Sequence, residues 1–296
     1  MAVVGMFDGV HAGHRYLLSC LRQRALRYGL APLAVTFSNH PLEQIAPAAA
    51  PKLLSTPDEK LLLLAREGVE VQMLPFDDAL RHTPAASFLQ MLRDRWGVSR
   101  LLLGFNNRFG FDAPRSLAGY ISLAASEGIA IEQADEFRPE SAEGPVSSSA
   151  VRALIAEGRV DEANRYLGRH YCVEGMVAHG KAIGRTIGFP TANVVPDFAR
   201  KLIPASGVYA AMALTADGHR HPAMVNVGVR PTINAGGGST IEANLIDFDG
   251  DLYGERLALE FATRLRSEQR FPDLDSLKHQ ILLDRTAALA ALTPKT

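Results

Sequence analysis

In the first half of the chain, short runs of apolar residues alternate with longer segments whose apolar positions recur at helical spacing. The apolar runs have the length of buried strands, and they are Ala2–Val4, Leu33–Phe37, Val71–Leu74, Arg100–Leu103 and Ile129–Ile131. Strands that alternate with helices in this way predict a parallel sheet with helices on both faces. The first half is therefore expected to be an α/β domain.

Three of the helical segments have recognisable boundaries. Thr56-Pro57-Asp58-Glu59 is a capping box with proline at the first helical position, and the helix that it opens should end near Gly68. Thr83-Pro84 opens another helix, which should close near Gly97. A third helix is expected over Arg15–Tyr28. One helix thus follows each of the first three predicted strands.

The pattern changes after the segment Leu167–Tyr171. From Val173 to Phe261, short β-prone runs are separated by glycine, proline, asparagine and aspartate. These runs include Gly207–Leu214, Ala223–Val227, Ile241–Phe248 and Leu257–Phe261. They predict an antiparallel sheet or a small β-barrel, followed by a C-terminal helix over Leu274–Leu292. We therefore expect two domains, residues 1–168 and residues 169–296.

Composition limits the classes of function. The chain has 296 residues, 47% of them hydrophobic, and a formal net charge of −1. Such a balance argues against a protein that coats nucleic acid or anionic membrane, but it leaves room for a site that binds one small polyphosphate. Cys20 and Cys172 form no CxxC pattern, so we expect no disulfide framework, no zinc site and a reducing cytoplasm. We also expect no signal peptide, because Asp8 and His11 interrupt the apolar start, and no membrane-spanning segment.

The segment after the first predicted strand is the sharpest candidate site. Gly5 follows the strand, and His11 and His14 stand on either side of Gly13 where the first helix begins. Ligands of α/β sheets bind at the carboxyl ends of strands, where backbone amides and helix N-termini favour phosphate. Imidazoles placed there could stabilise a phosphate whose charge rises in the transition state. An HxGH match alone is weak, since histidines in loops are mostly polar surface, but its place between strand and helix favours a site.

Two further segments of the first half carry candidate chemistry. Ser147–Ser149 and Arg152 stand at the start of a predicted helix, where hydroxyls and a guanidinium suit a phosphate. The plain alternative is a serine N-cap. Residues 103–110, LGFNNRFG, follow the fourth predicted strand, and their aromatic and amide side chains could hold a planar ring. The alternative there is an ordinary loop between a strand and a helix.

A glycine-rich string, GKAIGRTIGFPTAN at Gly180–Asn193, is the candidate site of the second half. It lacks the GxxxxGK[ST] pattern of a P-loop, but its glycines permit close approach of the backbone to phosphate. The Thr191 hydroxyl could ligate magnesium beside phosphate oxygens. Downstream, Glu242 stands between apolar residues on a predicted strand. A single glutamate there is ordinarily an exposed position on a half-buried strand, so the residues alone leave its role open.

Together these motifs resemble those of the bacterial bifunctional riboflavin kinase/FAD synthetase family. GMFDGVHAGH, TFSNHP, LLGFNNRFG and SSSAVR are similar to the four adenylyltransferase motifs of that family. GRTIGFPTAN, SGVYA, NVGVRPT, IEANLIDFDGDLYG and LRSEQRF are similar to its riboflavin kinase module. The resemblance covers essentially the whole chain in the family's domain order. It implies a Rossmann-like HxGH nucleotidyltransferase domain followed by a β-barrel kinase domain with a C-terminal helix.

The resemblance also implies substrates and residue roles. Riboflavin would be phosphorylated to FMN, and FMN adenylylated to FAD, with ATP as co-substrate and Mg²⁺ as the metal. Glu242 would be the general base on the ribityl hydroxyl and Thr191 the metal residue, while His11, His14 and Arg152 would stabilise developing charge in adenylyl transfer. The residues expected to bind nucleotide or flavin are Gly5, Phe7, Asp8, Gly13, Asn39, Phe105, Asn106, Arg108, Ser147, Ser148, Ser149, Gly180, Gly184, Arg185, Gly188, Pro190, Asn193, Asn226 and Arg266.

Two departures from the family pattern leave an alternative open. Met6 stands where the family often has asparagine, and Asn106 stands where an aspartate is expected. The change to asparagine removes a charge but keeps an acceptor and adds donors. The alternative is therefore a riboflavin kinase with a weak or inactive adenylyltransferase domain. A flavin-binding regulator without catalysis is disfavoured because all the candidate catalytic residues are present, and a cytidylyltransferase would leave the second half unexplained.

Overall fold

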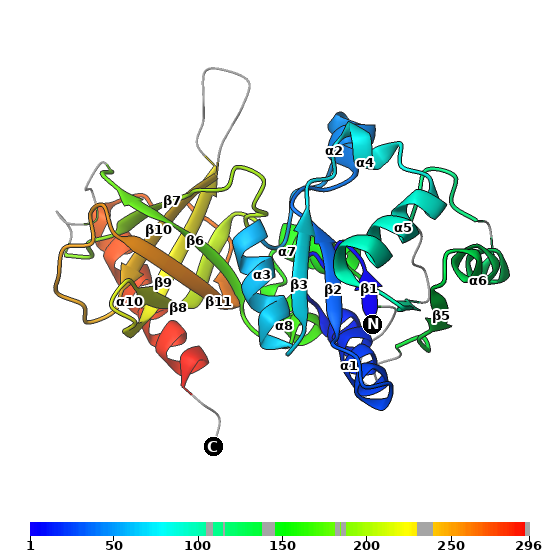
Figure 1. Ribbon diagram of the computed structural model, residues 1–296. Coiled ribbons are helices and arrows are strands. Elements are labelled where there is room, and N and C mark those ends of the chain that lie inside the picture. Colours follow the sequence, from blue (N-terminus) through cyan, green and yellow to red (C-terminus); the bar gives the residue numbers. More distant parts are fainter. Residues whose placement is uncertain are drawn as a thin grey trace. The chain divides into compact units, whose positions relative to one another are not determined.

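The structure is a computed structural model that describes residues 1–104, 109–114, 116–137, 146–180, 184, 188–229 and 239–293 (Figure 1). It divides into two compact units, Met1–Ser148 and Ser149–Thr296. Within the described ranges, no helix is long and apolar enough to cross a membrane.

A parallel five-stranded sheet organises the first unit, in the order β3-β2-β1-β4-β5. Its strands are β1 (Ala2–Val4), β2 (Leu33–Phe37), β3 (Glu70–Leu74), β4 (Arg100–Leu103) and β5 (Ala130–Gln133). The prediction of five parallel strands is confirmed, with shifts of one or two residues at the ends of β3 and β5. β1 is central, because it pairs with β2 on one side and β4 on the other. The loop that follows β1 therefore leaves the middle of the sheet.

Helices cover both faces of this sheet, as predicted. Val3 of β1 points to a cluster that includes residues of α1 (Ala12–Arg27) and α3 (Pro57–Arg66). Its neighbour Val4 points to the opposite cluster, which includes residues of α5 (Ala85–Trp96) and α6 (Leu117–Ser126). Alternate residues of a strand face opposite sides, so even a strand of three residues joins both hydrophobic cores.

The helix boundaries follow local capping chemistry. Thr56 and Glu59 form the predicted capping box of α3, and Gly97 ends α5 in the left-handed conformation at φ 62°. α1 begins at Ala12 instead of Arg15, because the side chain of His11 accepts the backbone N–H of His14 and serves as the N-cap. Three short elements escaped the pattern: α2 (Leu42–Ile45), the 3₁₀ helix η1 (Pro47–Ala49) and α4 (Asp78–Arg81).

A closed barrel of antiparallel strands organises the second unit, in the order β10-β7-β6-β11-β8-β9, with β9 pairing back to β10. Its strands are β6 (Tyr171–Ala178), β7 (Ala192–Pro196), β8 (Gly207–Thr215), β9 (Arg220–Val229), β10 (Ser239–Leu245) and β11 (Arg256–Arg266). Of the two predicted possibilities, sheet or barrel, the barrel is confirmed. β10 ends earlier than the predicted Phe248, because Asp247 turns the chain in the left-handed region at φ 57°.

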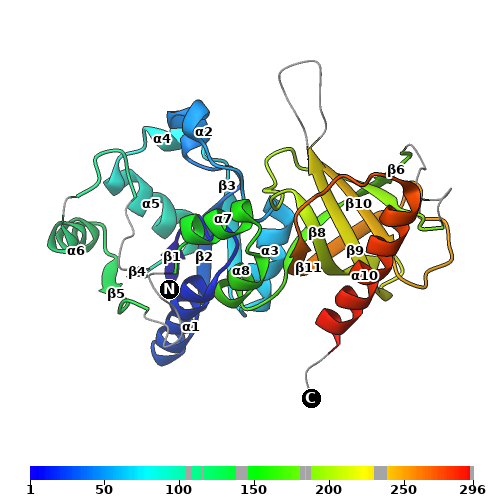
Figure 2. The same cartoon turned by 180° about the vertical axis from the view of Figure 1, so that it is seen from behind.

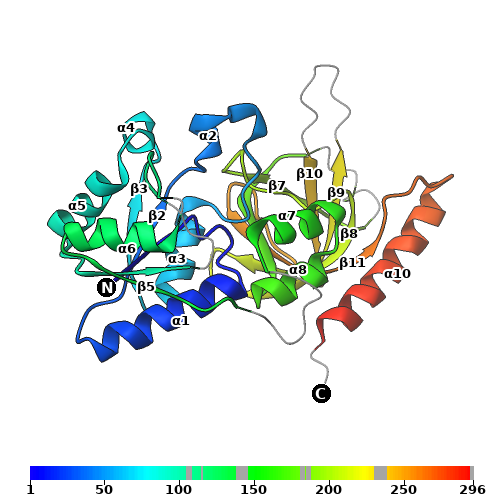
Figure 3. The same cartoon turned by 90° about the vertical axis from the view of Figure 1, so that its right-hand side faces the viewer.

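Among the described residues, the helices α7 (Ser148–Glu157), α8 (Val160–Leu167) and α10 (Leu274–Leu292) accompany the barrel. α10 lies along the outer surface of the barrel, where it contacts β8, β9 and β11 (Figures 2 and 3). Ala288 of α10 is fully buried against Ala210 and Met224 of the barrel. The C-terminal helix predicted over Leu274–Leu292 is thus confirmed as the cover of one barrel face.

The side chain of Asn164 connects α8 to the barrel through hydrogen bonds. Its Nδ2 donates to the carbonyl oxygens of Phe261 at 2.8 Å and Ala262 at 3.2 Å, and its Oδ1 accepts the N–H of Tyr171 at 2.7 Å. One side chain therefore satisfies backbone groups on both β6 and β11.

We expect Asn164→Ala to lower the unfolding free energy of the second unit by about 2 kcal/mol, because it leaves several partly buried backbone groups unpaired. Chemical denaturation followed by far-UV circular dichroism measures this loss. Trp96, the single tryptophan, lies in the first unit, and its fluorescence should report an unchanged transition there. Arg165→Ala is the matched control on the same helix, since the Arg165 side chain is 77% exposed. A control as destabilising as Asn164→Ala would contradict the assignment.

Candidate active sites

The turn between β1 and α1 carries both histidines. The N–H of Gly5 donates to the carbonyl of Val35 at 3.0 Å, which keeps the chain paired with β2 past the end of β1. Nδ1 of His11 accepts the N–H of His14 at 3.3 Å. The two imidazole rings stack with their centroids 3.7 Å apart, and Phe7 meets His14 edge-on at 5.1 Å. Both imidazoles are therefore held in fixed orientations at the start of a helix.

His14 is held in its neutral form. Burial, reinforced by the neighbouring His11 and Lys60, keeps the pKa of His14 well below its ordinary value of 6.5. Its Nδ1 is buried and has no hydrogen-bond partner among the described residues. A neutral imidazole has one N–H donor and one acceptor nitrogen. His14 therefore brings hydrogen-bonding capacity to the site without a fixed charge.

A pocket of about 350 Å³, here called the histidine pocket, opens beside this turn. Its walls bring together Gly5, Phe7, His11, Gly13, His14, Ser147 and Ser148 from the predicted site residues. They also include Tyr16 and Phe137, whose rings lie 5.2 Å apart. Ser148, at the start of α7, donates from Oγ to the carbonyl of Asp8 at 2.9 Å. The HxGH and serine motifs thus meet in one cavity, as their resemblance to a single site implied.

A second cavity of about 670 Å³, here called the aromatic pocket, lies on the other side of the same strand end. It shares Val4, Gly5 and Met6 with the histidine pocket. Its remaining walls are largely apolar and aromatic, from Phe37, Pro41, Ile45, Phe76, Leu80, Phe88, Phe109 and Phe111. A large apolar cavity joined to a phosphate-type site suits a planar ring attached to a phosphate.

Some predicted residues of the first half hold loops in place instead of lining a pocket. Asp8 is 2% exposed and accepts the backbone N–H groups of Leu54 at 2.9 Å and Ser55 at 3.1 Å. The side-chain amide of Asn39 pairs with both backbone groups of Phe76, at 2.9 and 2.8 Å. Arg152 donates to the hydroxyl of Ser149 at 3.0 Å. Phe105, Asn106 and Arg108 lie outside the described residues.

In the second unit, three polar side chains form a row across adjacent strands. Glu242 of β10 stands opposite Asn193 of β7 on one side and opposite Asn226 of β9 on the other. Directly paired residues of antiparallel strands point to the same face, so all three side chains share one surface of the sheet. Along β10, Ile241 and Ala243 are buried while Glu242 between them is half-buried. The alternation therefore turns the Glu242 carboxylate away from the barrel interior.

This carboxylate faces a pocket of about 350 Å³, here called the carboxylate pocket. The barrel contributes Gly184, Thr191, Asn226, Glu242 and Arg266 from the predicted residues. The segment after β11 and α10 contribute Phe271, Leu277 and Ile281 among the remaining walls. The C-terminal helix thus supplies the apolar side of a cavity whose polar side is the barrel.

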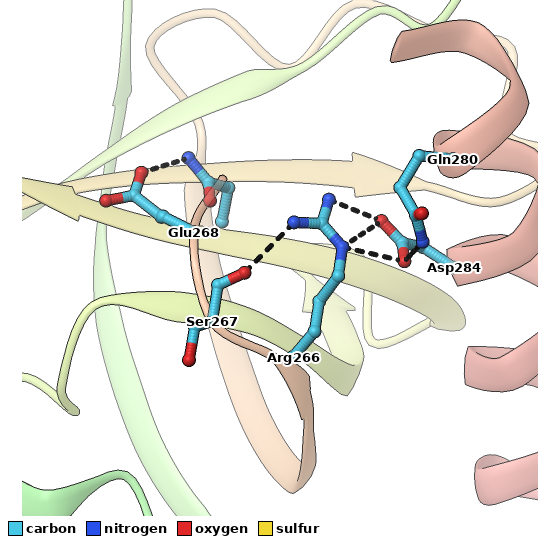
Figure 4. Close-up of polar contacts among 6 residues, drawn as sticks. Arg266, Ser267, Glu268, Gln280 and Asp284 are labelled. Atoms are coloured by element: carbon cyan, nitrogen blue, oxygen red, sulfur yellow. Dashed lines mark hydrogen bonds and ion pairs between the residues drawn. The ribbon is translucent and has the colours of Figure 1, made fainter. Parts of the chain in front are cut away.

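A buried ion pair fixes Arg266 at the edge of this pocket (Figure 4). Its Nε and Nη2 contact the carboxylate of Asp284 on α10 at 2.9 and 2.7 Å, and its Nη1 donates to the carbonyl of Ser267. Asp284 is 5% exposed and also accepts from Gln280, one turn earlier on the helix. Nearby, Glu268 accepts from Asn226 at 3.3 Å. Arg266 therefore joins β11 to α10, a contact that no sequence pattern predicts.

Thr191 lies between the carboxylate pocket and a second cavity of about 60 Å³, here called the loop pocket. The loop pocket is lined by Pro190, Ala192 and Ala243, and by Phe248, Gly250, Asp251 and Tyr253 of the segment after β10. The glycine string packs closely here, since a Cβ on Gly180 would lie 2.1 Å from the amide nitrogen of Asn193. Gly188 takes the left-handed conformation at φ 87°, and Arg185 lies outside the described residues. Thr191 is thus a wall residue of two cavities at once.

The donors around Thr191 fit magnesium. Mg²⁺ prefers oxygen ligands and keeps several waters and substrate phosphates. The hydroxyl of Thr191 and the side-chain amide of Asn193 supply oxygens next to a pocket that lacks thiols and imidazoles. The described residues hold no cluster of three histidine, cysteine or acidic side chains that would form an all-protein metal cage. Oxygen donors of this kind fit a magnesium ion whose other ligands are waters and phosphates.

Sequence reasoning missed three groups of residues that shape the sites. Lys60 is 3% exposed beneath the histidine turn, although a lysine in an amphipathic helix ordinarily faces water. Asp284 is likewise buried within a helix, and the pattern around it shows no reason for burial. The aromatic pocket draws its walls from separate segments of the first unit, so no single motif announces it.

Comparison with known proteins agrees with this geometry. Two family models match the chain, FAD synthetase over residues 1–150 and riboflavin kinase over residues 167–292. The bifunctional riboflavin kinase/FMN adenylyltransferase of Pseudomonas fluorescens is 37% identical, over 99% of this chain and 93% of its own length. The proteins of the same name from Escherichia coli K12 and Bacillus subtilis are 36% and 31% identical, over 96% and 97% of this chain and 90% of their own lengths.

A solved structure is similar over nearly the whole length. A crystal structure described as a macrolide-efflux protein from Streptococcus pneumoniae matches with a TM-score of 0.86 and 31% identity, over 97% of this chain and 93% of that one. Both family models and the curated relatives support two activities, and nothing among them favours the alternative of an inactive adenylyltransferase. The chain therefore belongs to the bifunctional riboflavin kinase/FMN adenylyltransferase family, whose members phosphorylate riboflavin to FMN and adenylylate FMN to FAD, both with ATP.

Proposed function

We propose that the two reactions are divided between the units, with riboflavin phosphorylation in the barrel and adenylyl transfer in the α/β unit. The observation that carries this division is the row of Asn193, Glu242 and Asn226, which gives the barrel a carboxylate of its own. The histidine pocket gives the α/β unit a separate site with two imidazoles, His11 and His14, and two serine hydroxyls, Ser147 and Ser148. The boundary between the activities at residue 168 stays a prediction, since the structural units divide after Ser148.

In the barrel, we place riboflavin in the carboxylate pocket and the terminal phosphates of ATP at the loop pocket, beside Thr191. The flavin ring would lie against the apolar side chains of α10, with its ribityl chain directed toward Glu242. Glu242 would accept the proton of the 5′-hydroxyl as that oxygen attacks the γ-phosphorus. The bond between the γ-phosphorus and its bridging oxygen to the β-phosphorus breaks, and ADP leaves. Thr191 suits the transfer point, because it borders both cavities.

Magnesium and location belong to the proposal as well. Thr191 and Asn193 would hold the metal, which when bound offsets the negative charge of the phosphates. The placement of Asn193 beneath Gly180 fixes the amide that this role requires. A cytoplasmic location, expected from the use of cysteine, remains a prediction.

In the α/β unit, we place ATP in the histidine pocket and the flavin of FMN in the aromatic pocket. A phosphate oxygen of FMN would attack the α-phosphorus of ATP across Gly5 and Met6, which both cavities share. The bond from the α-phosphorus to the bridging oxygen breaks, and pyrophosphate leaves. No general base is needed, because a phosphate monoester is already ionised at neutral pH. His11, His14, Ser148 and Arg152 would stabilise the charge that develops.

Glu242→Gln should lower FMN formation from riboflavin by about 100-fold or more, because the amide cannot accept the hydroxyl proton. Conversion of added FMN to FAD should stay within about twofold of the wild-type rate. Chromatographic separation of riboflavin, FMN and FAD measures both reactions on one sample. Glu174→Gln is the matched control, an exposed carboxylate on β6 of the same barrel. Loss of both activities in Glu242→Gln would refute the division between units.

His14→Ala should act in the opposite direction. FAD formation from FMN should fall by about 100-fold, because a preorganised donor is lost where charge develops, while FMN formation continues. The same chromatographic assay measures both, and the expected product pattern is accumulation of FMN. His82→Ala, at a half-exposed position on the same unit, should leave both activities intact. FAD formation that survives His14→Ala would remove this residue from the reaction.

The stability of the first unit should fall as the pH drops below 6.5. Because the folded pKa of His14 lies below its ordinary 6.5, the unfolded chain binds a proton that the folded chain does not. The unfolding free energy attributable to His14 should therefore decrease by up to about 1.4 kcal/mol per pH unit on acidification.

Denaturation at pH 7.5, 6.5 and 5.5, followed by the fluorescence of Trp96, measures this dependence. His14→Gln should show a shallower fall than the wild type, whereas His82→Gln should follow the wild type. Equal slopes for the wild type and His14→Gln would show that His14 titrates normally.

A further inference from the structure

Lys60 is a buried cation that the reactions described above do not use. It lies in the middle of α3, in the sequence PDEKLLLLAR, and only 3% of its surface is exposed. Burying an ammonium costs free energy unless it is paired and hydrogen-bonded. The contacts of the Lys60 ammonium therefore indicate the role of this buried charge.

The ammonium of Lys60 joins the ends of the two central strands. Its Nζ donates to the carbonyl of Met6, two residues after β1, at 3.1 Å, and to the carbonyl of Phe37, the last residue of β2. The Met6 carbonyl also accepts from the hydroxyl of Thr36 at 3.1 Å. The Met6 carbonyl belongs to the chain just before it turns toward His11, and the Phe37 carbonyl belongs to the end of the neighbouring strand. Lys60 donates to the backbone carbonyl of Met6, so the contact does not depend on the side chain at that position.

The segment before α3 also contacts this turn, at Asp8 and Gly9. The carboxylate of Asp8 accepts the N–H groups of Leu54 and Ser55, and the N–H of Gly9 donates to Oγ of Ser55 at 3.0 Å. Residues 54–60 therefore hold the turn at Met6, Asp8 and Gly9 through four groups that are remote in sequence: the N–H groups of Leu54 and Ser55, the Ser55 hydroxyl and the Lys60 ammonium. The Lys60 ammonium and the Asp8 carboxylate carry opposite charges. The turn residues that they fix, Met6 and Asp8, lie on either side of Phe7 in the sequence.

The turn needs such anchors because its backbone is strained. Phe7 and Val10 adopt positive φ values of 48° and 39°, and neither is glycine. The left-handed region costs an ordinary residue roughly 1–2 kcal/mol, and more for a β-branched side chain such as valine. Strain of this kind persists only where the surroundings over-determine the conformation. The positions of His11 and His14 follow directly from these two residues.

The charge of Lys60 also reaches the histidines. Burial lowers the pKa of Lys60 to about 8, against an opposing attraction to Asp8. Lys60 in turn contributes to the lowered pKa of His14. The cation is thus close enough to act on the imidazole, although it does not line the histidine pocket.

We propose that Lys60 is a positioning residue for adenylyl transfer, whose buried ammonium ties the ends of β1 and β2 together and so sets the strained turn that presents His11 and His14. Positioning errors near 1 Å lower the rate of a chemical step by about 100-fold. Lys60 therefore acts on the chemical step through the turn and leaves the binding of ATP and FMN largely intact. The inference rests on the placement of adenylyl transfer at the histidine pocket.

Lys60→Met tests this role, because methionine keeps most of the side-chain volume and removes the ammonium. We expect kcat for FMN adenylylation to fall by about 100-fold, with KM for FMN and for ATP within about threefold of the wild type. Riboflavin phosphorylation on the same chain should be unchanged, which controls for enzyme concentration and for the second unit. The midpoint of thermal unfolding, followed through Trp96, should fall by only a few degrees, because Asp8 keeps its backbone N–H donors and the Met6 carbonyl keeps the hydroxyl of Thr36.

Arg66→Met is the matched control, since it removes an exposed cation from the last turn of the same helix. It should leave both activities and KM values at wild-type levels. If Lys60→Met does not fold, Lys60→Gln keeps one donor and should still lose at least tenfold in kcat at unchanged KM. Wild-type kcat in the folded variant, or a rise in KM at constant kcat, would overturn the positioning role. The outcome of His14→Ala is independent of this test, so failure of the site assignment and failure of the Lys60 inference remain distinguishable.

Discussion

The strained turn after β1 is the constraint on which the first site depends. β1 has only three residues, yet it is the central strand and belongs to both hydrophobic cores. The chain must leave its end, cross the sheet edge and start α1 with His11 as the N-cap. Two non-glycine residues at positive φ achieve this, and two buried charges hold them there, Asp8 of the turn itself and Lys60 of the neighbouring helix α3. The buried ionisable groups make the turn rigid, and this rigidity gives the imidazoles a defined direction.

The barrel positions the polar side chains of its site by a different physical means. Its polar row is held by strand pairing, so Asn193, Glu242 and Asn226 need no strained backbone. The part of the site that strand pairing does not hold is α10, which supplies the apolar wall of the carboxylate pocket. The ion pair between Arg266 and Asp284 anchors that helix to the end of β11, and Asp284 is buried enough for the pair to be screened little by solvent. Removing one partner of such a pair leaves an uncompensated charge, which makes the position of α10 costly to change.

The sequence predicted what local patterns determine and missed what long-range packing determines. The five strands of the first unit, the capping box at Thr56 and the C-terminal helix follow from periodicity and local capping, and the structure contains all of them. The motifs at His11 and Thr191 were recognised because glycines, hydroxyls and imidazoles recur at short spacing. Lys60 and Asp284 were not, because each is an ordinary polar residue of a helix whose burial depends on a partner far along the chain. The same holds for the aromatic pocket, whose walls come from loops that only the finished sheet brings together.

Both units share a geometric solution that group transfer requires. In-line displacement needs the attacking group and the leaving group on opposite sides of the phosphorus, so donor and acceptor have to approach from different directions. In the first unit, two cavities flank the strand end formed by Val4, Gly5 and Met6. In the second, two cavities flank Thr191. The shared wall contains Gly5 in the first unit and is Thr191 in the second, so little side-chain bulk separates the paired cavities at these positions. An α/β sheet and a β-barrel have no topology in common. Both nevertheless place two pockets on either side of a short shared wall, an arrangement that suits in-line displacement.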